Sequence, residues 1–259
     1  MTHTPHPLEV QDADIGYGDT IVLKDLNFQV PHGARVAVVG PNGAGKSTLF
    51  KALVGLLPLK KGRILVHGSP LGQHKDCVAY IPQREEVDWR FPVTVGDVVM
   101  MGRYDRQGWL KRPSAEDRQV VRRSLEQMGI LQLADRSIGR LSGGQQQRAF
   151  LARALAQEPH VLLMDEPFTA VDITTQEATL SLLDQLRAQS VTAMISTHDL
   201  NLAAASFDLV LLLNHRLIAF GPPAEALSQP NLERAFGNSL LITDHGALLV
   251  DECCPPEEH

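Results

Sequence analysis

The chain of 259 residues contains no long hydrophobic run. Its most apolar segment, residues 209–213, is far shorter than the roughly 18 consecutive apolar residues that a membrane-spanning helix requires. Residues 1–7 also lack the basic region and apolar core of a secretory signal peptide. The sequence therefore predicts neither a membrane-spanning helix nor a signal peptide.

Cysteine and positive charge are scarce as well. The three cysteines, Cys77, Cys253 and Cys254, show no disulfide-framework spacing, which suits a reducing cytoplasm. The 24 Lys and Arg residues are outnumbered by 30 Asp and Glu residues, for a net charge of −6. Because this balance gives no basic footprint for a phosphate backbone, we expect no nucleic-acid partner.

Short apolar strands and helical segments alternate along the chain, and this order predicts an α/β core. Strands are expected at residues 8–10, 23–30, 35–39, 63–67, 78–81, 161–164, 193–196, 209–213 and 216–220. Three helices are expected. One covers residues 46–57, one begins at the capping pair Ser114 and Asp117, and one lies around residues 176–188. Residues 94–157 are expected to form an inserted helical subdomain, and the Pro- and Glu-rich residues 251–259 are expected to be disordered.

A phosphate-binding loop lies between an expected strand and an expected helix. Its residues match G-x-x-x-x-G-K-[ST] in this order: Gly40, Pro41, Asn42, Gly43, Ala44, Gly45, Lys46, Ser47 and Thr48. The backbone amides of such a loop cradle the β-phosphate, aided by the helix dipole. Lys46 is expected to reach the β- and γ-phosphates, and the Ser47 hydroxyl to bind Mg²⁺.

A second anion-facing segment follows about a hundred residues later. Ser142, Gly143 and Gly144, followed by Gln145, lie where a turn enters a helix. Glycines let backbone amides approach an anion, and a helix N-terminus favours negative charge. Since one loop suffices to wrap one nucleotide, this segment is best explained if it faces a nucleotide held by another subunit.

Two carboxylates, Asp165 and Glu166, end the apolar strand 161–164. The carboxyl end of a buried parallel strand should emerge beside the phosphate loop, where open α/β sheets bind ligands. We expect Asp165 to hold Mg²⁺ through water and Glu166 to act as general base on the attacking water. The alternative is a solvated carboxylate pair at a strand end.

Three further polar residues are weaker candidates. His198 follows the strand 193–196 and is placed to contact the γ-phosphate and the water, although a lone histidine is usually structural. Gln83 follows the strand 78–81 and is placed to reach Mg²⁺ and water, although Gln is not a strong metal ligand. Tyr17 is a candidate for stacking on adenine, and a packed core tyrosine would look identical in sequence.

Together these residues resemble the nucleotide-binding subunit of an ABC transporter, over the chain to about residue 225. The family's elements appear in order: the aromatic Tyr17, Walker A at 40–48, the Q-loop Gln83, the signature 141–145, Walker B at 161–166, the D-loop with Asp172, and the switch His198. The resemblance implies a P-loop NTPase core with a helical subdomain and an N-terminal antiparallel β subdomain. It also implies ATP and Mg²⁺ as ligands, and a head-to-tail homodimer with each ATP between Walker A and the partner's signature.

A finer resemblance lies in residues 86–103, which are similar to the subgroup that serves bacterial manganese, zinc and iron importers. This implies membrane permease subunits as partners, an extracytoplasmic substrate-binding protein as an indirect one, and a place on the cytoplasmic face of the membrane. Trp89 and Phe91 are expected to anchor the permease, unless both are core residues. Among the metals, manganese is slightly favoured.

Other functions stay open at this point. A siderophore or heme importer, or an exporter, would carry the same motifs. A non-transport ABC protein is disfavoured because the chain has neither a long coiled-coil insertion nor a second cassette, and a non-catalytic one because Glu166 is present. The tail holds Asp251, Glu252, Cys253, Cys254, Glu257 and His259. Its adjacent cysteines lack metal-site spacing, so disorder is the preferred interpretation.

Overall fold

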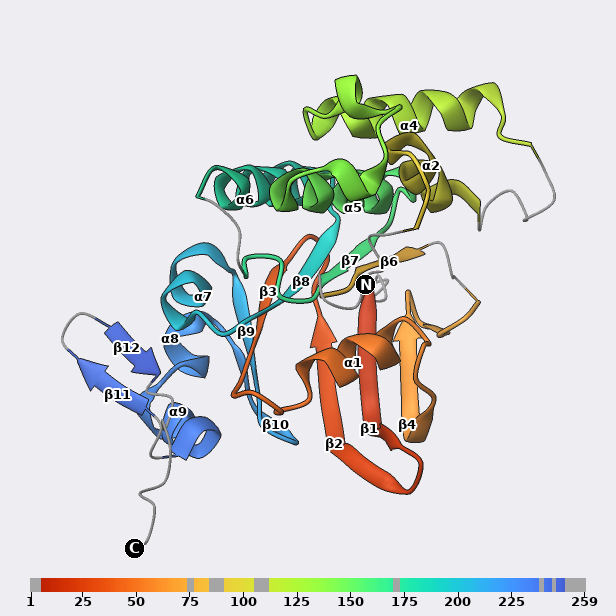
Figure 1. Ribbon diagram of the computed structural model, residues 1–259. Coiled ribbons are helices and arrows are strands. Elements are labelled where there is room, and N and C mark those ends of the chain that lie inside the picture. The colour runs from red at the N-terminus through yellow and green to blue at the C-terminus, as the bar shows by residue number, and fades with distance from the viewer. Residues whose placement is uncertain are drawn as a thin grey trace, which may run out of the picture.

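Two sheets and a group of helices form the part of the chain that the computed structural model describes: residues 6–73, 77–83, 91–104, 112–169, 173–237, 240–243 and 246–249. Side chains are described for these ranges except residues 173, 174 and those from 240 onward. Figure 1 shows the helical group at one end of the molecule and the two sheets below it. The α/β class expected from the sequence is confirmed.

The larger sheet has six strands in the order β10-β9-β3-β8-β7-β6. All neighbouring pairs are parallel except β9 and β10. The strands are β3 (Arg35–Val39), β6 (Val78–Ile81), β7 (Val161–Met164), β8 (Thr192–Thr197), β9 (Leu209–Leu213) and β10 (Leu217–Gly221). Every residue of β7 and β8 is buried, as expected for parallel strands that are covered on both faces.

The smaller sheet is antiparallel, in the order β2-β1-β4-β5. Its strands are β1 (Leu8–Tyr17), β2 (Thr20–Val30), β4 (Leu59–Val66) and β5 (Ser69–Pro70). Helix α1 (Lys46–Leu53) lies between the two sheets in Figure 1. Its buried Leu49, Phe50 and Leu53 join β1, β2 and one face of the parallel sheet in a single apolar cluster.

The other face of the parallel sheet is covered by helices. The helical group within 94–157 contains α2 (Val95–Met100), η3 (Met101–Arg103), α4 (Ala115–Gln127), η4 (Leu131–Leu133), η5 (Ile138–Arg140) and α5 (Gly143–Ala156). It shares a second apolar cluster with α6 (Ile173–Ala188), α7 (Leu200–Ser206) and parallel-sheet residues such as Leu162 and Ile195. The chain then forms α8 (Pro223–Ala226), α9 (Gln229–Phe236) and the hairpin β11 (Leu240–Thr243) with β12 (Gly246–Leu249).

The expected elements differ from the structure in a few places. Helix α1 ends at Leu53 rather than near residue 57, because Gly55 has φ of +76° and turns the chain before Pro58. Strand β1 runs on to Tyr17 through irregular pairing with β2, beyond the expected 8–10. Helices α7 to α9 and the last hairpin were not expected. Residues 251–259 lie outside the described residues, so their disorder stays a prediction.

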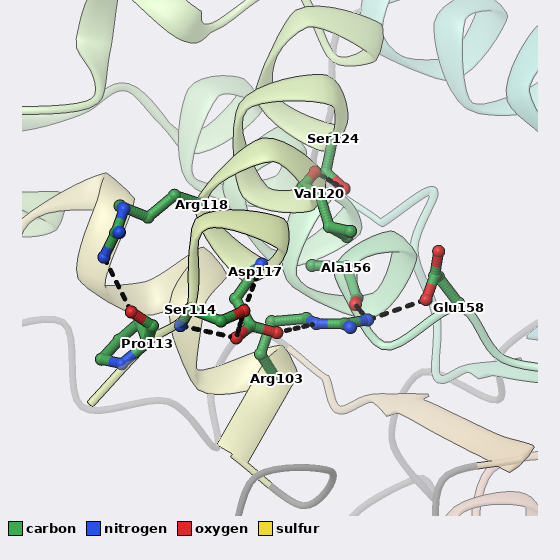
Figure 2. Close-up of polar contacts among 9 residues, drawn as sticks. All are labelled: Arg103, Pro113, Ser114, Asp117, Arg118, Val120, Ser124, Ala156 and Glu158. Carbon is green, nitrogen blue, oxygen red and sulfur yellow. Dashed lines mark hydrogen bonds and ion pairs between the residues drawn. The ribbon is translucent and has the colours of Figure 1, made fainter. Parts of the chain in front are cut away.

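A buried ion-pair network joins three elements of the helical group (Figure 2). Arg103, at the end of η3, donates from Nε to Asp117 Oδ1 at 3.0 Å and from Nη1 to Ala156 O at 2.9 Å and Glu158 Oε2 at 2.8 Å. Asp117 also accepts from the backbone N–H of Ser114 at 2.8 Å in the capping box of α4. Burial acts against the Arg103 charge, yet the bonds to Glu158 and Asp117 prevail, so the pKa of Arg103 is raised.

Replacing Arg103 with Met should destabilise the protein strongly, because the Asp117 side chain is only 6% exposed and its buried carboxylate would lose its cationic partner. Removing one partner of a buried pair typically costs about 3–5 kcal/mol. Urea unfolding of the variant checks this. The matched control is Arg122→Met, which breaks an exposed pair with Glu126 and should cost less than about 1 kcal/mol. Equal unfolding midpoints for the two variants would contradict the structural role of Arg103.

Candidate functional site

The polar residues expected at strand ends converge at the carboxyl edge of the parallel sheet. Strand β3 leads into Gly40, β6 into Gln83, β7 into Asp165 and β8 into His198. A cavity of about 470 Å³ opens there. It is lined by Asn42, Gly43, Ala44, Gly45, Lys46, Ser47, Thr48, Gln83 and Glu166. The structure therefore brings the phosphate loop, Gln83 and Glu166 together around one space.

A close backbone contact at Gly40 and a positive φ at Gly45 explain two of the loop glycines. A Cβ on Gly40 would lie 2.1 Å from the carbonyl oxygen of Leu213 at the end of β9. Gly45 has φ of +99°, and a Cβ there would meet the Leu23 side chain at 2.6 Å. The backbone N–H of His215 also donates to Ala44 O at 3.1 Å. The phosphate loop is thus held against β2 and the β9–β10 turn in a shape that only glycine permits at these positions.

Lys46 is buried at the floor of the cavity, 6% exposed. Its ammonium donates to Gly40 O at 2.9 Å and to Pro41 O at 3.2 Å, so the charge lies within the loop. Burial lowers the pKa of Lys46, and the nearby carboxylates of Glu166 and Asp165 oppose this shift. An anionic phosphate in the cavity would favour the charged ammonium in the same way that these carboxylates do.

Ser196 links the two carboxylates at the end of β7. Its hydroxyl donates to Asp165 Oδ1 at 2.5 Å and accepts the backbone N–H of Glu166 at 2.8 Å. The other carboxylate oxygen, Asp165 Oδ2, is buried without a hydrogen-bond partner among the described residues. Such an oxygen fits water-mediated binding of Mg²⁺, a cation that prefers oxygen ligands. No sequence pattern predicted a role for Ser196. Its position at the end of a core strand was the one feature that could have indicated it.

Glu166 borders a second, smaller cavity as well. That space of about 90 Å³ is lined by Glu166, Phe168, Thr169, Gln176, Ser196, Thr197, His198, Asp199 and Leu202. Glu166 has the left-handed φ of 47°, and its Oε2 accepts a hydrogen bond from Thr169 Oγ1 at 3.1 Å. The exposed His198 therefore lies close to the candidate base, across the smaller cavity. Asp172 lies outside the described residues, and its role stays a prediction.

Tyr17 is 48% exposed at the end of β1, which excludes the interpretation of a packed core tyrosine. It does not belong to the residues that line the 470 Å³ cavity. Phe91 is 59% exposed, so it is no core residue either. Its expected companion Trp89, with the rest of residues 84–90, lies outside the described residues.

The signature segment lies at the start of α5, separate from the loop cavity. Ser142 is the exposed N-cap, and Gly143 and Gly144 form the first turn. The Gln145 side chain folds back to accept the N–H of Ser142 at 3.1 Å, while Gln145 N–H points to Ser142 Oγ at 3.4 Å. Gln145 therefore serves here as a helix-capping residue. The phosphate loop and the signature segment therefore lie apart within one chain, and binding of an anion by the signature segment stays a prediction.

Comparison with known proteins identifies the family to which this chain belongs. The family described as ABC transporter matches residues 23–169, and the chain belongs to it as an ATP-binding subunit or domain. The zinc transport system ATP-binding protein of Treponema pallidum is 45% identical over 94% of this chain and 91% of its own length. The manganese transport system ATP-binding protein of Bacillus subtilis is 44% identical, over 90% of this chain and 94% of its own length.

A solved structure agrees in shape. An ABC transporter of metal-chelate type in an inward-facing conformation contains a chain that superposes with a TM-score of 0.80 at 30% identity. The match covers 95% of this chain and 98% of that one. Within the described residues, none of the helices has the length and apolarity to cross a membrane.

Tyr17→Ala should weaken ATP binding by roughly 5- to 30-fold, which corresponds to about 1–2 kcal/mol for loss of aromatic stacking on a base. Titration with a fluorescent ATP analogue measures the effect, and Tyr17→Phe should retain affinity. Ile21→Ala is the matched control, because Ile21 is 47% exposed on the same β1–β2 hairpin. If the Tyr17 and Ile21 variants bind equally well, Tyr17 does not contact the adenine.

Proposed function

We propose that this chain hydrolyses ATP as the energy-coupling subunit of an importer for a divalent metal, zinc or manganese before iron. The observation that carries the enzymatic part is the position of Glu166, on the wall of the loop cavity and of the smaller cavity beside His198. The names of the zinc and manganese relatives support the metal. The metal-chelate description of the solved transporter supports a chelated metal as the second candidate cargo.

The proposed reaction transfers the γ-phosphoryl group of ATP to water. A Glu166 carboxylate oxygen takes a proton from water as the water oxygen bonds to the γ-phosphorus. The bond from that phosphorus to the β–γ bridging oxygen breaks, and ADP and phosphate leave. Lys46 and the loop amides stabilise the charge that develops on the phosphate oxygens, and His198 orients the water. Ser47, Gln83 and Asp165 would hold Mg²⁺, and the ion would supply positive charge against the phosphates.

The proposed active form is a head-to-tail homodimer. The amides of Gly143 and Gly144 lie in the first turn of a 14-residue helix, whose N-terminus carries partial positive charge. Because the loop cavity of the same chain does not include them, a γ-phosphate bound by a second copy is the ligand that they fit. The contact is isologous as a whole, so both nucleotide sites would form together.

The proposed membrane partner is a permease that docks beside α2. Phe91, Met101 and Tyr104 are all large apolar or aromatic side chains that are at least 38% exposed near this helix. Grouped apolar side chains of this kind serve as anchors in protein interfaces. Docking there would place the chain on the cytoplasmic face of the membrane, where an extracytoplasmic binding protein acts on it only through the permease.

Glu166→Gln should bind ATP normally and hydrolyse it about 10²- to 10⁴-fold more slowly, the usual effect of removing a general base. Steady-state phosphate release by the purified protein provides the measurement. The control is Ser124→Ala, which removes a hydroxyl that donates to Val120 O within α4 and borders neither of the two cavities beside Glu166. Hydrolysis by Glu166→Gln at the control's rate would refute the assignment of the base.

Because the same variant keeps ATP bound, it also tests the dimer. Light scattering should report twice the monomer mass with ATP and the monomer mass with ADP. Adding Lys46→Ala should abolish the difference, since that ammonium lies at the floor of the phosphate cavity. A mass that is the same with both nucleotides counts against the ATP-dependent sandwich.

Metal uptake by cells tests the importer itself. Lys46→Ala should abolish uptake of the transported metal, because the permease then lacks the ATP-hydrolysing subunit that drives it. Uptake of zinc, manganese and iron is measured separately with a radioactive isotope of each metal. Deletion of residues 252–259 is the control and should leave uptake intact. If uptake of all three metals survives the loss of Lys46, the metal-importer proposal fails even where ATP hydrolysis is confirmed in vitro.

A further inference from the structure

Three metal-ligating side chains meet at the edge of the parallel sheet opposite the nucleotide cavity. Cys77 precedes β6 and His160 precedes β7, so both lie at the amino ends of these strands. His67 comes from the turn between β4 and β5 of the antiparallel sheet. One ligand atom from each of His67, Cys77 and His160 lies within 4.8 Å of the other two. None of these residues takes part in ATP binding or hydrolysis as proposed above.

The backbone fixes the cluster from several sides. The N–H of His160 donates to Cys77 O at 2.8 Å, and the N–H of Thr192 donates to His160 O at 2.9 Å. The N–H of His67 donates to Pro7 O at 3.3 Å, and His67 has the left-handed φ of 50°. These bonds join segments that are far apart in the sequence. The positions of the three side chains are therefore set by the backbone of the fold.

The side chains themselves are close to a metal-binding arrangement. His67 Nε2 and His160 Nδ1 are 2.8 Å apart, with their rings edge-to-face at 4.8 Å between centroids. A tetrahedral zinc ion with Zn–N near 2.0 Å and Zn–S near 2.3 Å separates its ligand atoms by roughly 3.3–3.6 Å. An ion would thus replace the direct contact between the rings after a small outward shift of the two nitrogens. His67 and Cys77 are half-buried and His160 is exposed, so an ion can enter from solvent.

We propose that His67, Cys77 and His160 bind one Zn²⁺ ion through two imidazole nitrogens and a thiolate. Water takes the fourth position, or His32, whose exposed ring stacks on His67 with centroids 5.7 Å apart. Thiolate and imidazole ligands select zinc over manganese, which prefers carboxylate and water oxygens. The site is therefore a zinc site whichever metal is transported, and the proposal does not rest on the proposed function.

A bound ion would connect the two sheets. It would tie the β4–β5 turn of the antiparallel sheet to the starts of β6 and β7, where the imidazole pair of His67 and His160 now makes the contact. Since a ligand that binds only the folded protein stabilises it, zinc should raise the unfolding temperature. At free zinc roughly 100 times Kd, the expected rise is about 5–10 °C for a chain of this size.

The test uses full-length protein with Cys253→Ser and Cys254→Ser in every sample, which removes the tail thiols as ligands. Co²⁺ is added under reducing conditions as a spectroscopic substitute for Zn²⁺. We expect one equivalent to produce the near-ultraviolet thiolate-to-cobalt band and tetrahedral visible bands, and Zn²⁺ to displace both. Cys77→Ser should abolish the thiolate band, and nucleotide titration confirms that each variant is folded.

His67→Asn and His215→Asn form a matched pair, because both histidines have left-handed φ values, 50° and 54°, which Asn tolerates. His67→Asn should weaken Co²⁺ binding more than about tenfold, since even outer-shell changes often cost 10- to 100-fold. His215→Asn, on the β9–β10 turn, should leave Co²⁺ affinity unchanged. A parent protein without a thiolate band, a band that survives Cys77→Ser, or equal affinity in the two Asn variants would each overturn the proposal.

Discussion

The register of the parallel sheet is the constraint on which the nucleotide site depends. Ile81 pairs with Met164, Met164 with Ile195, and Val39 with Thr197. These pairings bring the residues that follow each strand to one edge of the sheet. The loop, Gln83, the two carboxylates and His198 therefore lie near one another, although they are far apart in the sequence. A slip of one residue would turn buried side chains of β7 or β8 to the opposite face. Since both strands are buried throughout, packing enforces the register and with it the site.

The site holds charge in a place where burial opposes it. Lys46 and Asp165 are both almost fully buried, and Asp165 keeps one oxygen without a hydrogen bond among the described groups. The energetic cost of such groups is tolerated because the rest of the fold over-determines their positions: Ser196 fixes Asp165, and the loop carbonyls fix Lys46. Nucleotide phosphates, and the hydrated Mg²⁺ proposed above, would supply the charges that complete this arrangement. Binding should therefore stabilise the folded protein as well as prepare the reaction.

The sequence allowed much of this to be predicted, where a local pattern controls the result. Apolar runs located β3, β6, β7 and β9 to the residue, and the residues of the loop pattern line the 470 Å³ cavity. Local sequence patterns did not predict features that depend on contacts between residues far apart in the sequence. Ser196 acts on Asp165 31 positions away, and His67 meets His160 at a separation of 93 positions. Likewise, Gln145 matches a signature position, yet the structure adds that its amide caps α5.

The two edges of the parallel sheet are joined by the same two strands. Strand β7 separates His160 from Asp165, and β6 separates Cys77 from Gln83, so each pair is roughly 17–20 Å apart along an extended chain. Buried strands transmit little stretch, because their length is fixed by the hydrogen-bond ladder and by packing on both faces. An ion at the amino edge would therefore leave Asp165 and Gln83 where they are. The ion can instead change how firmly the antiparallel sheet is attached to the parallel sheet. The antiparallel sheet carries Tyr17, the candidate adenine contact. Coupling between zinc and nucleotide, where it exists, should then appear in adenine affinity rather than in the hydrolytic step.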